Sequence, residues 1–307
     1  MAALTLPLFS FGQITQEQVN AIRSRAESTN TDLKAKSELA LMYLLGKGVP
    51  QDTSMALKFL REIDAWAEAN KVKMGGYVPA GTSKIQCLIG EIYAFGDPRV
   101  PRDLAEAARW FLKSAANGYP NAQNNLGELL ANGRGVKKDL IEAIGWFRKA
   151  AEAGHVKAQY NLGNCYLQGD GVASDFSQAV TWFRKAAEGG HSAAQFQMGV
   201  LCLAGIDVVS KDEKQAVAWF RKSAEQGDSD AQFWLGELLA KGTGVDKDQV
   251  EAFAYLSLAR ANSPGANSKL PILEKKMTAD EISAGVRRAK ELQKEIEAKM
   301  AAKKAGK

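Results

Sequence analysis

A unit of about 36 residues recurs along this chain of 307 residues, and it constrains the fold more than any other feature. An aromatic residue marks the same place in every unit, and an aspartate stands seven residues before it. The aromatic residues are Phe59, Trp110, Trp146, Trp182, Trp219 and Tyr255, and the aspartates are Asp52, Asp103, Asp139, Asp175, Asp212 and Asp248. The sequence therefore predicts a repeat array over residues 31–266, with units near residues 35–69, 85–120, 122–156, 158–192, 194–229 and 231–266.

Each unit has the pattern of two short helices joined by a turn. In the unit that starts at Ala122, apolar residues recur at helical spacing and form one face of a first helix. A turn follows at Gly133, and Asp139 then has the place of an N-cap, with Glu142 three residues later to complete a capping box. A glycine inside the first helix, Gly127, recurs in four other units and predicts that the two helices approach closely.

Helices this short are marginal in water, so neighbouring hairpins must bury each other's apolar faces. The expected fold is therefore all-α, a right-handed α-solenoid of stacked helical hairpins. The spacing from Phe59 to Trp110 is longer than the others, and an insertion loop at residues 70–83 accounts for the difference. We expect this loop to lie on the surface.

Separate segments flank the array at residues 1–30 and 267–307. Thr15 and Gln18 have capping-box spacing and predict an N-terminal helix that caps the first unit. Thr278 and Glu281 have the same spacing and predict a final helix, followed by a Lys-rich tail. The apolar stripe expected to dock this final helix on the last hairpin consists of Ile282, Val286, Ala289 and Ile296.

The unit at residues 158–191, AQYNLGNCYLQGDGVASDFSQAVTWFRKAAEGGH, resembles the Sel-1-like repeat. The resemblance covers about 230 of the 307 residues and implies a tetratricopeptide-like helical array of about six repeats. The first and last units match it least, as expected of capping units. Two turns depart from it by an extra residue, at 97–99 and at 207–211. The resemblance implies an adaptor, scaffold or chaperone-like role and names no partner.

The distribution of charge argues against a nucleic-acid partner. The formal net charge is +5, but residues 271–307 hold ten Lys and Arg against six Asp and Glu, so the rest of the chain is close to neutral. A nucleic-acid binder usually carries its basic excess on the folded body. The second helices do repeat a basic pair, which we expect on a solvated outer face, with an acidic partner as the alternative. These pairs are Arg148/Lys149, Arg184/Lys185 and Arg221/Lys222.

The compartment stays open at this point. Residues 1–11 are apolar, like the core of a secretory signal, but no Lys or Arg precedes Arg23. The sequence thus favours the cytoplasm and leaves export to the periplasm open, if residues 2–11 are a truncated signal segment. No apolar run is long enough to predict a transmembrane segment.

No catalytic, cofactor-binding or metal-binding residues are predicted, and the chain is expected not to be an enzyme. The G-x-G pairs in the turns lack the strand–helix context of a phosphate-binding loop. His155 and His191 occupy one position in successive units, where they are expected to begin helices too far apart to hold one metal. The cysteines have no C-x-x-C spacing and are expected to be buried thiols. They are Cys87, Cys165 and Cys202.

The outward face of the first helices is the predicted partner-binding surface. Its residues are Tyr160, Asn164, Leu167, Phe196, Val200, Leu203, Phe233 and Glu237. An apolar face of this kind indicates a partner site if it is exposed, but the same aromatic residues could instead pack between repeats. We predict a non-enzymatic interaction module that binds a partner peptide or helix in a concave groove. The alternatives are a small-ligand or enzyme-like site built across repeats, and an envelope-located assembly factor. Partner identity and oligomeric state are not predicted.

Overall fold

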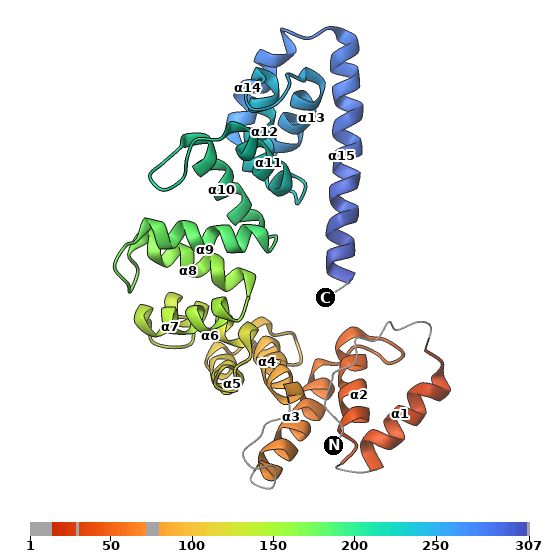
Figure 1. Cartoon of the computed structure of the whole chain (residues 1–307). Coiled ribbons are helices and arrows are strands. Elements are labelled where there is room, and N and C mark those ends of the chain that lie inside the picture. The colour runs from red at the N-terminus through yellow and green to blue at the C-terminus, as the bar shows by residue number, and fades with distance from the viewer. Residues whose placement is uncertain (1–13, 29–30, 72–79, 306–307) are drawn as a thin grey trace. The chain divides into compact units, whose positions relative to one another are not determined.

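The computed structural model describes residues 14–28, 31–71 and 80–305, and within these ranges it contains fifteen α-helices and no strand (Figure 1). The first helices of the six hairpins are α2 (Leu33–Leu45), α4 (Ala80–Phe95), α6 (Pro120–Asn132), α8 (Val156–Gln168), α10 (Ser192–Ala204) and α12 (Ser229–Lys241). The second helices are α3 (Thr53–Asn70), α5 (Leu104–Ala116), α7 (Leu140–Glu152), α9 (Phe176–Glu188), α11 (Glu213–Ala224) and α13 (Gln249–Ala259). This arrangement confirms the all-α hairpin repeat. The chain forms two compact units, residues 1–158 and 159–307.

The aspartate before each second helix joins the two helices of its hairpin. Asp139 accepts a hydrogen bond from the backbone N–H of Glu142 at 2.9 Å and so begins α7. The N–H of Asp139 donates to the carbonyl of Leu130 in α6 at 3.0 Å. Of the two hydrogen bonds of the predicted capping box, only the one from the Glu142 N–H to Asp139 therefore forms. Glu142 instead accepts a hydrogen bond from the indole N–H of Trp146 at 3.2 Å.

The glycine inside most first helices lies against an aromatic ring of the second helix. A Cβ atom at Gly127 would lie 2.7 Å from the ring of Phe147, and one at Gly163 would lie 2.7 Å from the ring of Phe183. Both distances are shorter than a carbon–carbon contact allows. The predicted close approach of the two helices is confirmed.

Two adjacent aromatic residues of the second helix have different environments. Trp146 is half-buried, whereas Phe147 is only 3% exposed. The ammonium of Lys149 lies 4.2 Å from the centroid of the Trp146 ring, within range of a cation–π contact. The same contact recurs between Lys185 and Trp182 at 4.1 Å and between Lys222 and Trp219 at 4.4 Å. The lysines of the basic pairs therefore lie over tryptophan rings on the outer face of the second helices.

Helix α1 (Gln16–Ser28) covers the first hairpin, as predicted. Thr15 and Gln18 form both bonds of a capping box, with the Thr15 N–H donating to Gln18 Oε1 at 3.0 Å and the Gln18 N–H donating to Thr15 Oγ1 at 3.3 Å. Val19 is fully buried, and a Cβ atom at Gly48 would lie 2.7 Å from its side chain. Helix α1 therefore takes the place of a preceding second helix.

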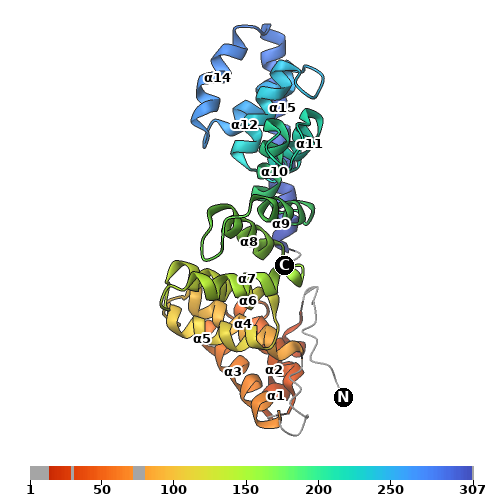
Figure 2. The same cartoon turned by 60° about the vertical axis from the view of Figure 1, so that its left-hand side comes forward.

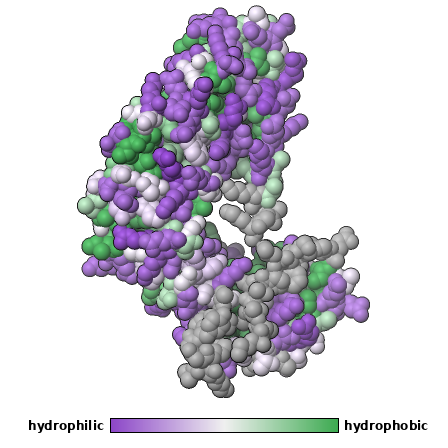
Figure 3. Space-filling model, viewed as in Figure 1, coloured by the Kyte–Doolittle hydropathy of each residue, from purple (hydrophilic) through white to green (hydrophobic). Residues whose placement is uncertain are grey.

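At the other end of the array, α14 (Pro264–Glu274) contacts α12 and α13 (Figure 2). Helix α15 (Ala279–Ala305) begins at the predicted capping box, where the Glu281 N–H donates to Thr278 Oγ1 at 3.2 Å and the Thr278 N–H donates to Glu281 Oε2 at 2.7 Å. It runs along α13, and its outer side is mainly hydrophilic (Figure 3).

The contacts that dock α15 differ in part from the predicted stripe. Ile296 is buried as expected, but Val286 is 41% exposed. The buried positions include Leu292 and also Gly285, where a Cβ atom would lie 2.6 Å from the ring of Phe253. A helical wheel treats Gly285 as a weakly apolar residue. It does not show that the ring of Phe253 occupies the space that a side chain at this position would fill.

Two sequence expectations fall partly outside the described residues. Of the predicted insertion loop at residues 70–83, residues 72–79 are not described, and residues 80–83 are helical, because α4 begins at Ala80. The apolar stretch at residues 1–11 also lies outside the described residues.

Candidate functional site

The predicted surface residues lie on three first helices of the unit 159–307. Helix α8 carries Tyr160, Asn164 and Leu167, helix α10 carries Phe196, Val200 and Leu203, and helix α12 carries Phe233 and Glu237. Each set is spaced by three or four residues, so each lies along one face of its helix.

The three aromatic residues of this surface are half-buried and pack against neighbouring helices. Tyr160 stacks on His191, the N-cap of α10, with ring centroids 4.4 Å apart. The ring of Phe196 lies 5.8 Å from that of Phe220 in α11. Phe233 reaches α14, where a Cβ atom at Gly265 would lie 2.9 Å from its ring. These rings hold helices together and leave only part of their area at the surface.

The polar residues of the surface differ in their surroundings. Glu237 is only 8% exposed and forms salt bridges with Lys241 at 2.8 Å and with Lys269 of α14 at 3.4 Å. Asn164 is half-buried on α8. The charge of Glu237 is therefore neutralised within the protein, whereas Asn164 presents a neutral amide.

Leu167 is the residue of this surface most open to solvent. Leu167 is 40% exposed, and Val200 and Leu203 are half-buried. They lie one or two turns beyond the packed aromatic rings, toward the C-terminal ends of α8 and α10. Their apolar area is available to a partner without any change in the packing of the helices.

Trp234 is an exposed aromatic residue that the sequence analysis did not select. It is 37% exposed, and its ring stacks on that of Phe220 at 6.2 Å. The matching positions of α8 and α10 are the polar residues Asn161 and Gln197. A tryptophan where α8 and α10 carry polar residues was the available signal.

The two histidines begin helices, as predicted. His155 Nδ1 accepts a hydrogen bond from the Ala158 N–H at 3.1 Å, and His191 Nδ1 accepts one from the Ala194 N–H at 3.3 Å. Burial lowers the pKa of His155, which favours the neutral ring that can accept this bond. No group of three or more His, Cys, Asp or Glu side chains that could hold a metal ion occurs among the described residues.

The three cysteines are buried free thiols, and we expect them to resist modification in the folded protein. Burial raises the pKa of Cys165 from 9.0 to about 11 and also raises the pKa values of Cys87 and Cys202. Because the thiolate is the reactive form, a rise of this size in the pKa lowers the reactivity of the thiol on the order of 100-fold near neutral pH.

The rate of reaction of these cysteines with a disulfide reagent should therefore rise at least 100-fold, on the order of the loss given by the pKa, when guanidinium unfolds the chain. Glutathione in the same two solvents is the control, and a thiol that reacts equally fast in both states would contradict the buried placement.

Six stretches of the chain match the Sel1 repeat family. They cover residues 33–62, 84–119, 120–155, 156–191, 192–228 and 229–263. The chain belongs to the Sel1 repeat family. Sel1 repeat proteins are usually non-catalytic scaffolds, and their fold is typical of protein-binding modules.

The solved structures that resemble this Sel1 repeat protein include the following two. A Sel1 repeat protein from Oxalobacter formigenes is 31% identical, with 84% of this chain and 69% of that chain covered and a TM-score of 0.72. A protective antigen of uropathogenic Escherichia coli strains that displays the SLR fold is 28% identical, with 94% and 74% covered and a TM-score of 0.51. None of the curated proteins matches this chain. Among the described residues, no helix of this Sel1 repeat protein is both long and apolar enough to cross a membrane.

Proposed function

We propose that this Sel1 repeat protein is a non-catalytic interaction module that binds a peptide or helix of a partner protein on the face of α8, α10 and α12. The observation that carries the proposal is the exposed side chain of Leu167, with the half-buried Val200 and Leu203, beside aromatic rings that are already fixed. Aromatic residues are enriched at the energetic centres of protein interfaces.

The fixed rings also lower the cost of binding. Tyr160 is held between His191 at 4.4 Å and Phe183 at 5.7 Å between ring centroids. A side chain that is already ordered loses little conformational entropy when a partner covers it. The surface is therefore suited to a partner that offers apolar side chains to a preformed site.

The polar residues define what the partner must contribute. Asn164 can donate and accept a hydrogen bond, which suits a peptide amide or another neutral polar group. Glu237 is paired with Lys241 and Lys269, so it contributes shape rather than net charge at the α12 end. The partner segment is expected to be apolar with neutral polar groups.

A photo-crosslinking amino acid at Leu167 or at Leu203 tests this surface in the full-length chain in its native cells. We expect both positions to capture the same partner, because both lie on the proposed face. Val208 is the matched position for a control, since it is 54% exposed and lies on the turn between α10 and α11. Capture of the same proteins from Val208, or of none from either leucine, would overturn the proposal.

Purified partner then provides the affinity measurement. Leu167→Glu with Leu203→Glu is expected to weaken binding by at least about tenfold, because each change places a charge against apolar partner area. Val208→Glu makes the same chemical change elsewhere and is expected to leave the affinity within about twofold. Phe196→Ala is not suitable, because it also removes packing against Phe220. Unchanged circular dichroism is required of every variant.

A further inference from the structure

In two repeats the turn between the helices rests directly on the preceding second helix. A glycine four residues before the N-cap aspartate makes this contact. A Cβ atom at Gly135 would lie 2.4 Å from the carbonyl carbon of Leu104, at the start of α5. One at Gly244 would lie 2.4 Å from the carbonyl oxygen of Glu213, at the start of α11. The absence of a side chain closes the seam between successive repeats at these positions.

The two repeats with lengthened turns have a side chain at this position, and a cleft opens beside each of them. Arg99 replaces the glycine in the turn after α4, and Val208 replaces it in the turn after α10. The cleft beside Arg99 has a volume of about 710 Å³, and the cleft beside Val208 has about 460 Å³. Their walls on the preceding second helix are equivalent: Ser54, Leu57 and Arg61 in α3, and Ser177, Val180 and Arg184 in α9.

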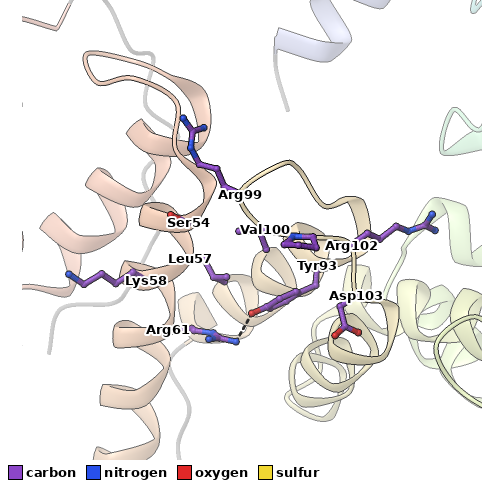
Figure 4. A pocket seen from close by; sticks show the side chains of 10 residues that line it. Ser54, Leu57, Lys58, Arg61, Tyr93, Arg99, Val100, Arg102 and Asp103 are labelled. Carbon is purple, nitrogen blue, oxygen red and sulfur yellow. Dashed lines mark hydrogen bonds between the residues drawn. The ribbon is translucent and has the colours of Figure 1, made fainter.

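The cleft beside Arg99, in the unit 1–158, has an apolar floor and a basic rim (Figure 4). Leu57 and Val100 are buried beneath it. The rim consists of Lys58, Arg61, Arg99 and Arg102. In the cleft beside Val208, a threonine stands in the place of Lys58 and a valine in the place of Arg99. The two clefts share a position in the repeat and differ in charge.

The turn that presents Arg99 is held by the side chain of Asp97. Asp97 accepts hydrogen bonds from the backbone N–H groups of Arg99 and Val100, each at 2.8 Å. A hydrogen bond from the Thr53 side chain and the bond from Val100 lower the pKa of Asp97, so it stays ionised at neutral pH. Arg99 itself donates to the carbonyl of Gln51 at 3.0 Å. The turn is therefore tied to the start of α3.

The carboxylates around the cleft are already engaged, which leaves positive charge available. Asp103 accepts backbone hydrogen bonds as the N-cap of α5. Asp52 caps α3 and lies 3.7 Å from Arg99. Glu106 accepts from Trp110 and lies 3.7 Å from Arg61. By contrast, neither Lys58 nor Arg102 has an ion-pair partner among the described residues. Both residues are exposed to solvent.

The geometry points to a peptide-binding cleft that takes an acidic, extended segment of a protein partner at the seam between α3 and the turn after α4. Figure 4 shows Arg99 and Arg102 projecting from the turn toward different sides, while Lys58 projects from α3 away from the turn. The cations are too dispersed around the rim to surround one compact anion. An extended chain with several carboxylates can meet them in succession while its apolar side chains contact Leu57 and Val100. This site is separate from the surface proposed on α8, α10 and α12.

Fluorescence anisotropy of the full-length chain with a labelled peptide of alternating aspartate and leucine tests the cleft at low salt. We expect saturable binding that weakens as salt screens the charges. A peptide with asparagine in place of every aspartate should not bind. Lys58→Thr with Arg99→Val, which gives the cleft the residues of its α9 counterpart, should lower the affinity about tenfold, equivalent to about 1.4 kcal/mol.

Arg134→Val with Lys137→Thr is the matched control, because it removes two exposed cations from the next turn without touching the cleft. It should leave binding unchanged. Lys58→Glu is a second test that does not disturb the turn, and it should weaken binding at least as much as the double variant. Three results would overturn the proposal. The control variant could lose as much affinity as Lys58→Thr with Arg99→Val, the asparagine peptide could bind, or the native chain could show no saturable binding. Complete competition by millimolar inorganic phosphate would also overturn it, since the site would then be one for a compact anion.

Discussion

Phe220→Ala is expected to lower the free energy of unfolding by about 3 to 5 kcal/mol, the range for removal of a buried phenylalanine side chain. Phe220 is fully buried in α11. Its ring contacts Phe196 and Trp234 at centroid distances of 5.8 and 6.2 Å, and it lies where a side chain on Gly199 would be. The substitution leaves a cavity at the point where α10, α11 and α12 meet.

Trp219→Ala is the comparison, because it removes a larger ring from the adjacent position. Trp219 is half-buried, and Lys222 covers its ring at 4.4 Å. We expect this variant to cost only about 1 to 2 kcal/mol. Urea denaturation of the full-length chain gives both values, and hydrogen exchange of α10 to α12 amides locates the loss, since repeat arrays can unfold in parts. An equal cost for the two variants would contradict the assignment of Phe220 as the core residue.

This contrast shows what the repeat pattern could predict and what it could not. The recurring tryptophan revealed the repeat and its length, because a large aromatic residue returns at intervals of 36 or 37 residues. On a helical wheel Trp146 and Phe147 are neighbours about 100° apart, so helical spacing does not tell which of them is buried. Which of two adjacent residues is buried depends on where the next repeat lies, and a single helix does not contain that information.

For the candidate surface, too, the sequence predicted the face of each helix but not the contacts between repeats. Helical spacing correctly grouped Tyr160, Asn164 and Leu167 on one face of α8. It could not tell that the Tyr160 ring stacks on His191 of the next repeat, because this contact joins residues 31 positions apart and depends on how hairpins stack. The basic cleft was equally hidden. The extra residue beside Arg99 is visible in the sequence, but its effect depends on the backbone contact that glycine makes at the other turns.

Gly127→Ala and Gly145→Ala are expected to change stability in opposite directions, although both replace a glycine inside a helix of the same hairpin. At Gly145 no atom lies within 4 Å of the added methyl, so the gain in helix propensity should stabilise the protein by about 0.5 to 1 kcal/mol. At Gly127 the methyl would lie 2.7 Å from the ring of Phe147 and 3.2 Å from the carbonyl oxygen of Ala143. Overpacking of this kind should cost about 1 to 3 kcal/mol.

The first repeat indicates why the cost at Gly127 has an upper limit. It carries Ala40 at the position of Gly127 and Leu60 at the position of Phe147, and both residues are buried. A hairpin can therefore accept the methyl when the residue at the facing position is not an aromatic ring, and Gly127→Ala should strain the α6–α7 contact rather than prevent folding. Urea denaturation of the two full-length variants, with native protein as reference, measures the difference. If both changes stabilise the protein, the close approach of α6 and α7 is not what requires glycine, and the recurrence of glycine at this position would need another cause.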